Sequence, residues 1–242
     1  MARAALEVPD PVRNYLGIDP LARVSKKKLI LIGFVYKLKI LLSNVVAKLI
    51  LRRLAGKSIL RISVAYVSVI ITGLWNAIVL LKTVKEARLR LFGNLIARYI
   101  AKELFTEVKI GSLSERTRIG CIQAIGNSIV LTQNYHPNML ILLVRLSEIL
   151  KIREDRDFAN WESFLETLRV VDVKEKFFLL NILTVAAAFD GKLSRLEKKD
   201  LREAYGEYTE IYYGRISDLK NHLLAGRYNA AKSMCDLSFV PE

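Results

Sequence analysis

Acidic residues are missing from a long stretch near the start of this chain. Between Asp19 and Glu86 there is no Asp or Glu, whereas thirteen Lys or Arg residues occur there. Residues 1–110 hold 20 basic and 6 acidic residues, and residues 111–242 hold 18 of each, so the net charge of +14 belongs entirely to the first part. Such an uneven charge indicates a polyanionic partner for the first half, either a membrane surface or nucleic acid.

Cysteine and proline are also scarce. The two cysteines, Cys121 and Cys235, lie far apart in apolar surroundings, which excludes a disulfide framework and predicts buried free thiols in a reducing compartment. Three of the five prolines fall within residues 1–25, which we expect to form an extended arm. The rest of the chain is nearly free of helix breakers and rich in Leu, Ala, Lys and Glu, so it is predicted to be helical.

Histidine is limited to His136 and His222. Neither has a cysteine, a carboxylate or a second histidine at a spacing typical of a metal site. The chain also lacks a nucleophile elbow, a phosphate-binding loop and a zincin motif. We therefore predict a protein that is not an enzyme and has no cofactor.

One long hydrophobic run stands out. The segment 62–81 has twenty residues without an ionisable acid or base, and Arg61 and Lys82 bound it. A helix of that length covers about 30 Å, which matches the hydrocarbon core of a bilayer. We predict that it inserts in a membrane, where Gly73, Trp75 and Asn76 contact a neighbouring helix. The alternative is a helix buried inside a soluble bundle.

The segment 26–59 combines apolar residues with cations. Lys37, Lys48 and Arg52 fall on one helical stripe, and apolar residues cover most of the remaining surface. This pattern fits a helix that lies at a membrane interface, and it also fits an amphipathic helix of a bundle. The residues predicted to contact anionic lipid are Lys26, Lys27, Lys28, Lys37, Lys48, Arg52, Arg53, Lys57, Arg61, Lys82 and Lys85.

The second half has the pattern of a helical bundle in water. After 62–81 the helix is expected to continue to about Phe105, and a turn at 108–113 marks a domain boundary. Ser112-x-x-Glu115 and Ser194-x-x-Glu197 are predicted capping boxes, and Asn138 is a predicted N-cap. Further helices are predicted at 115–132, 139–152, 159–169, 174–189, 195–206, 208–222 and 227–236. The aromatic cluster Tyr205, Tyr208, Tyr212 and Tyr213 is predicted to lie in the core or at an interface.

Two segments resemble known families. The first covers about residues 48–97, where a glycine, an asparagine and a following amphipathic helix fall on Gly73, Asn76, Val84, Ala87-Arg88 and Phe92. This segment resembles the end of EcsC-type proteins, a bacterial family associated with membranes. The resemblance implies a membrane-associated helical region.

The second segment is 180–201, in which an alanine-rich helix leads to Asp190-Gly191 and then to Ser194 and Glu197. It resembles the helix–turn–helix of TerB-like domains, the tellurite-resistance family, and implies an all-α domain over about 112–236. Some members are thought to bind divalent metal, which makes Asp190 and Glu197 candidate ligands. A bound cation would be repelled by four basic residues around the same turn, and the two carboxyl-bearing residues also suit a turn and a helix cap.

These observations predict an all-α protein with three parts: an arm at 1–25, a basic hydrophobic membrane region at 26–108, and a TerB-like bundle at 112–236. We expect a non-enzymatic scaffold at the cytoplasmic face of a membrane, bound to anionic lipid and to an unidentified protein partner. Self-association is open. The alternatives are a soluble helical binding module, with nucleic acid as a possible ligand, and a small subunit of a larger membrane complex.

Overall fold

The computed structural model describes residues 16–20, 34, 37, 38, 41, 60–133, 135–152, 157–193 and 195–241. The protein is all-α, as predicted. The chain divides into two compact units, one formed by residues 1–23 and 83–242 and the other by residues 24–82. We predicted a boundary at 108–112, whereas the larger unit already begins at Thr83, inside a helix.

Helix α3 runs from Leu60 to Tyr99 without interruption. A π-helical turn, Ile100–Leu104, continues it and ends where the backbone N–H of Phe105 donates to the carbonyl of Ile100. The predicted continuation to about Phe105 is therefore confirmed. The predicted turn at 108–113 is wrong for most of its length, because a short helix, α4 (Glu107–Ser112), occupies it.

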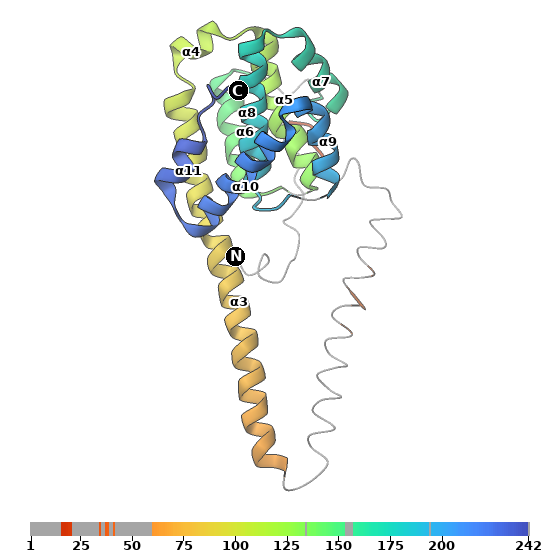
Figure 1. Cartoon of the computed structure of the whole chain (residues 1–242), viewed down its shortest axis with the longest axis vertical. Helices are drawn as coiled ribbons and strands as arrows, with labels where there is room; N and C mark the ends of the chain where they lie inside the picture. Colours follow the sequence, from red (N-terminus) through yellow and green to blue (C-terminus); the bar gives the residue numbers. More distant parts are fainter. Residues whose placement is uncertain are drawn as a thin grey trace. The chain divides into compact units, whose positions relative to one another are not determined.

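Seven further α-helices follow in the described part of the chain, and their order is seen in Figure 1. They are α5 (Glu115–Thr132), α6 (Pro137–Ile149), α7 (Trp161–Val170), α8 (Val173–Ala188), α9 (Arg195–Tyr205), α10 (Thr209–Ala225) and α11 (Tyr228–Met234), with a 3-10 turn, Gly206–Tyr208, between α9 and α10. These bounds agree with the predicted helices to within a few residues.

Helices α5 and α8 form the centre of the bundle (Figure 1). Both are buried on nearly all sides, because α6 and α7 pack on α5 while α10 packs on α8. The close packing of α5 against its neighbours requires glycine at two positions of this helix. A Cβ atom added at Gly120 would lie 2.9 Å from Leu179 Cδ1, and one at Gly126 would lie 2.7 Å from the Phe158 carbonyl oxygen. Larger side chains at these two positions would push α5 away from its neighbours.

The predicted caps of two helices are corrected by the structure. Helix α5 is capped by Ser114, whose hydroxyl accepts from Thr117 N, so the predicted box at Ser112 is wrong. Helix α6 is capped by His136 instead of Asn138, and Pro137 takes the first helical position, where proline's missing N–H is not needed. Of the second predicted box, Ser194 lies outside the described residues.

The tyrosine cluster lies at the core, as predicted. Tyr205 and Tyr212 are fully buried and stacked, with ring centroids 4.5 Å apart. Burial raises the pKa of both phenols, and Tyr205 Oη lies 3.0 Å from the hydroxyl of Thr184. Cys121 and Cys235 are buried free thiols, also as predicted, and burial raises the pKa of Cys235 to about 12.

Candidate functional site

The part of α3 that belongs to the larger unit has two different faces. Its inner face buries Leu89, Gly93 and Ile96 in the bundle core, and Ile100 of the following π-helical turn is buried there as well. On a helix with 100° between successive residues, the opposite face is formed by residues separated by alternating steps of four and three. The outer face consists of Val84, Arg88, Leu91, Leu95 and Arg98, and all five are exposed.

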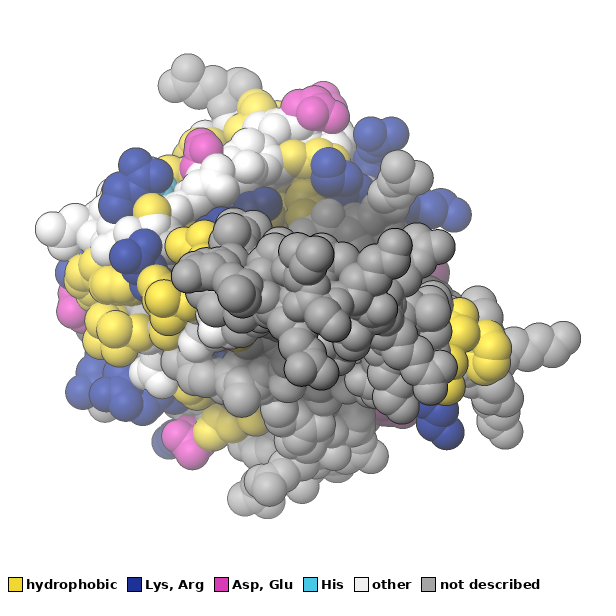
Figure 2. All heavy atoms as spheres, turned by 90° about the horizontal axis from the view of Figure 1, so that it is seen from below, with side chains coloured by type: hydrophobic (Ala, Val, Ile, Leu, Met, Phe, Trp, Pro, Cys, Tyr) yellow, Lys and Arg dark blue, Asp and Glu magenta, His cyan; other side chains and the backbone are white. Residues whose placement is uncertain are grey.

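The outer face is both apolar and cationic. Leu91 is 59 % exposed and Leu95 is 39 % exposed, which is unusual for leucines that repeat on one stripe of a helix. Arg88 and Arg98 are interleaved with them, and Lys85 is exposed nearby. Figure 2 shows hydrophobic side chains next to Lys and Arg side chains on the described surface. Such a surface suits a partner that is apolar and carries negative charge.

Three of the residues on α3 before Thr83 are large, hydrophobic and exposed: Ile78, Leu80 and Leu81. Along the described residues, no helix is sufficiently long and apolar to pass through a bilayer. The side chains of residues 60–72, 74 and 75 are not described. The prediction that segment 62–81 inserts in a membrane therefore stays a prediction.

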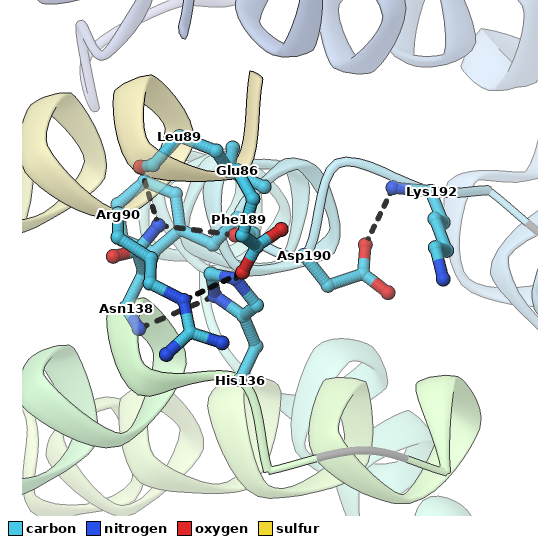
Figure 3. Close-up of polar contacts among 8 residues, drawn as sticks. All are labelled: Glu86, Leu89, Arg90, His136, Asn138, Phe189, Asp190 and Lys192. Atoms are coloured by element: carbon cyan, nitrogen blue, oxygen red, sulfur yellow. Dashed lines mark hydrogen bonds and ion pairs between the residues drawn. The ribbon is translucent and has the colours of Figure 1, made fainter. Parts of the chain in front are cut away.

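The inner face of α3 is attached to the bundle through Asn138 of α6. The side-chain amide Nδ2 donates to the carbonyl of Leu89 on α3 at 2.9 Å and to that of Phe189, after α8, at 3.2 Å. Asn138 is completely buried, and Figure 3 shows it between the three segments. It approaches α3 at Gly93, where an added Cβ atom would lie 2.0 Å from Asn138 Nδ2. One amide thus holds three helical segments together.

A second contact lies one turn earlier on α3 (Figure 3). Glu86 Oε1 accepts from Arg90 Nε at 2.6 Å, and His136 Nε2 lies 3.4 Å from the same oxygen. His136 Nδ1 accepts from the Asn138 backbone N–H, and its Nε2 faces Glu86. His136 thus caps α6 through Nδ1 and lies beside Glu86 of α3 through Nε2.

These contacts change the acidity of Glu86. Its side-chain contact with His136, together with the bond from Arg90 and the electrostatic attraction to these two side chains, lowers its pKa to about 2 although burial acts in the opposite direction. A lowered carboxyl pKa means that folding favours the ionised form. The stabilisation is present above the ordinary pKa of 4.5 and is lost as the pH falls through about 2.

We expect Glu86→Gln to lower the free energy of unfolding by about 1–2 kcal/mol at pH 7, because it removes the charge from both contacts. The difference from the unsubstituted protein should shrink between pH 5 and pH 2. Thermal melts over this pH range measure it. Glu166→Gln is the matched control, because Glu166 pairs with Arg169 at 3.6 Å on the surface, where such pairs contribute about 0–1 kcal/mol. An equal loss for both variants at pH 7 would contradict the prediction.

Asp190 and Glu197, the predicted metal candidates, are both buried. Asp190 Oδ1 accepts from the backbone N–H of Lys192 at 2.8 Å and closes the turn that Gly191 forms with a φ of +71°. Burial, followed by the negative charge of Glu197, raises the pKa of Asp190 to about 8. Within the described ranges no three His, Cys, Asp or Glu side chains are grouped as metal ligands. The contacts of Asp190 in the structure are therefore those of a residue that closes a turn.

The predicted lipid-contact residues are described only in part. Lys37, Lys82 and Lys85 are exposed, and the side chain of Arg61 is not described although its backbone belongs to α3. Gly73 and Asn76 are exposed on α3, and the side chain of Trp75 is not described. The remaining predicted contacts lie outside the described residues: Lys26, Lys27, Lys28, Lys48, Arg52, Arg53 and Lys57.

Sequence reasoning missed the contacts that hold α3 on the bundle. The sequence pattern predicts Asn138 as a helix cap, finds no metal-site spacing for His136, and does not single out Gly93. The signal for the outer face was present, because the alternating spacing of Leu91 and Leu95 with Arg88 and Arg98 can be seen in the sequence. This signal is hard to recognise in the sequence, because the inner face of the same helix carries a second apolar stripe.

No protein-family model matches this chain, and no curated protein or solved structure is detectably similar to it. The resemblances to EcsC-type and TerB-like proteins therefore stay predictions.

Proposed function

We propose that this protein is a membrane-associated helical scaffold, whose basic and apolar N-terminal half contacts anionic lipid while the helical bundle receives a protein partner. The observation that carries the proposal is the outer face of α3. Its exposed leucines would enter the acyl region beside the headgroups, and Arg88 and Arg98 would contact phosphates. The one acidic residue in this part of α3, Glu86, is turned inward to Arg90 and His136 and so does not oppose an anionic surface.

The bundle contributes a scaffold with buried thiols, which is compatible with the reducing cytoplasmic side of a membrane. We further propose that the bundle is a TerB-like domain. The turn at Asp190-Gly191, which lies between α8 and α9, supports this proposal. Nucleic acid is the weaker partner, because the cations on α3 alternate with leucine and valine instead of lining a polar surface.

Co-sedimentation with vesicles tests the proposal. The full chain should pellet with phosphatidylcholine vesicles that contain phosphatidylserine, and bind much less to phosphatidylcholine alone, since each cation near an anionic surface contributes about 1 kcal/mol. Leu91→Glu combined with Leu95→Glu should lower the partition coefficient by about tenfold or more. Both side chains are exposed, so circular dichroism should show an unchanged fold.

Ile211→Glu provides the matched control, because Ile211 is an exposed apolar residue on α10, away from α3. It should leave vesicle binding unchanged. A full chain that stays in the supernatant with anionic vesicles would refute membrane association. Equal effects of the α10 and α3 substitutions would refute the assignment to the outer face.

The spacing of the outer face favours a second candidate, a subunit of a larger membrane complex. Alternating steps of three and four are also the contact pattern of a helix packed along another helix. A second copy of this chain is disfavoured as that partner, because Arg88 and Arg98 of the two copies would face each other. Copurification in mild detergent that is lost in the Leu91→Glu, Leu95→Glu variant, without a change in vesicle binding, would select this candidate.

A further inference from the structure

A cavity of about 430 Å³ lies on the bundle away from the outer face of α3. Its walls come from the end of α4 with the following connection, the start of α8, and the C-terminal segment after α11. Leu113, Phe177, Phe178 and Leu237 form the apolar part, and each is itself buried. The proposed scaffold function does not use this space.

The walls are held in place by contacts of their own. Asn181 Nδ2 donates to the carbonyls of Leu237 and Phe239, at 3.2 and 2.8 Å, and so ties the C-terminal segment to α8. The guanidinium of Arg215 lies 3.7 Å from the centre of the Phe239 ring. Phe178 packs on Phe105, with ring centroids 5.6 Å apart. The cavity is therefore formed before any ligand arrives, as is usual for small-molecule sites.

Apolar surface extends to the mouth of the cavity. Val240 lines it and is 51 % exposed, and Val173, beside the lining residues Asp172 and Lys174, is 68 % exposed. An apolar ligand in the cavity would cover Val240 and remove its surface from water.

The charged groups at the mouth differ in what they already contact. Both carboxylate oxygens of Glu175 accept from Ser114, one from its backbone N–H at 2.8 Å and one from its hydroxyl at 3.0 Å. Asp172 Oδ1 caps α8 by accepting from Glu175 N. Lys174 is exposed and has no partner among the described residues. Among these three charged groups of the lining, Lys174 is the one whose charged end contacts no other described residue, while the second oxygen of Asp172 also faces solvent, so a ligand that pairs with Lys174 must lie on the side away from Asp172.

We propose that this cavity binds an amphiphile with a single short acyl chain and a carboxylate head. The chain lies among Leu113, Phe177, Phe178 and Leu237, and the carboxylate pairs with Lys174. Small-molecule sites span about 300–1,000 Å³, so this cavity lies near the lower limit and suits one medium-length chain instead of a two-chain lipid. The pairing of a carboxylate with an ammonium group provides a charge-assisted hydrogen bond that an alcohol cannot form.

Photo-crosslinking tests the proposal on the full chain in nanodiscs of neutral lipid. The probe is decanoate with a diazirine near the end of its chain, and mass spectrometry locates the labelled residues. Labelling should fall within residues 172–178 and 236–241. Decanoate should compete with the probe about tenfold better than decanol, because only decanoate can form the charge-assisted hydrogen bond with Lys174. Lys174→Gln should lower this labelling about tenfold, whereas Lys176→Gln, an exchange on the same helix outside the cavity lining, should leave it unchanged.

Equal competition by decanol, or equal labelling in the Lys174→Gln variant, would overturn the carboxylate assignment. Labelling concentrated on residues 84–102 would overturn the cavity assignment and would place the acyl chain on the outer face of α3. That last result would leave the proposed membrane function standing, because vesicle binding measures it separately. Conversely, a chain that fails to bind vesicles but is labelled in the cavity would refute only the scaffold proposal.

Discussion

Replacing Gly93 by alanine should destabilise the bundle by about 3 kcal/mol, although alanine is the better helix former. The added methyl group would lie 2.0 Å from Asn138 Nδ2 and 2.5 Å from Asn138 Cγ. Asn138 is fully buried and cannot move aside without leaving its two acceptors, the carbonyls of Leu89 and Phe189. Each buried hydrogen bond that is broken without replacement costs about 1–3 kcal/mol.

Thermal unfolding followed by circular dichroism measures this effect. For a unit of this size, 3 kcal/mol corresponds to a fall in melting temperature of roughly 6–12 °C. Gly214→Ala is the matched control, because Gly214 lies in helix α10 and nothing is within 4 Å of the position of an added Cβ atom. That variant should gain about 0.5–1 kcal/mol from its higher helix propensity.

A double-mutant cycle identifies the contact responsible. In the Asn138→Ala background the clash is absent, so the additional Gly93→Ala substitution should cost much less than it does in the unsubstituted chain. If Gly93→Ala costs the same in both backgrounds, then the close approach to Asn138 is not the reason that glycine is needed at this position.

Asp190→Asn should stabilise the protein at alkaline pH and change little at pH 4. Burial and the nearby charge of Glu197 raise the pKa of Asp190 from 3.8 to about 8. Between these two values the folded protein keeps a proton that the unfolded chain has released, so the stability of the protein falls as the pH rises through this window. Asparagine stays neutral at every pH, and its side-chain oxygen can still accept from Lys192 N.

At pH 8.5 we expect Asp190→Asn to raise the free energy of unfolding by an amount on the order of 3 kcal/mol. This lies below the upper limit set by the raised pKa of Asp190, since a pKa change of one corresponds to about 1.36 kcal/mol. Melting temperatures of the two proteins measured from pH 4 to pH 9 should therefore diverge steadily. Asp218→Asn, at an exposed position on α10, should follow the unsubstituted protein throughout. Parallel curves for Asp190→Asn and the unsubstituted protein would show that Asp190 does not hold an extra proton in the fold.

The helices could be predicted from the sequence because their signals are local. The length of α3 follows from forty residues without proline, and α8 follows from a long apolar run after Asp172 that contains neither proline nor glycine. Most helix ends were placed within a few residues. Caps were less predictable, because several polar residues near each start can serve. The sequence favours Ser112, which has Glu115 three residues later, whereas the structure uses Ser114, which also contacts Glu175, sixty-one residues later.

The sequence by itself determined that this protein is helical and that its positive charge is concentrated in the first half, since composition, charge and periodicity need no knowledge of distant contacts. Only the tertiary structure decided which stripe of α3 is buried and which is exposed, because both stripes carry large aliphatic side chains. Packing made the choice at Gly93, where the absence of a side chain lets Asn138 reach the helix backbone and turns Leu91 and Leu95 outward.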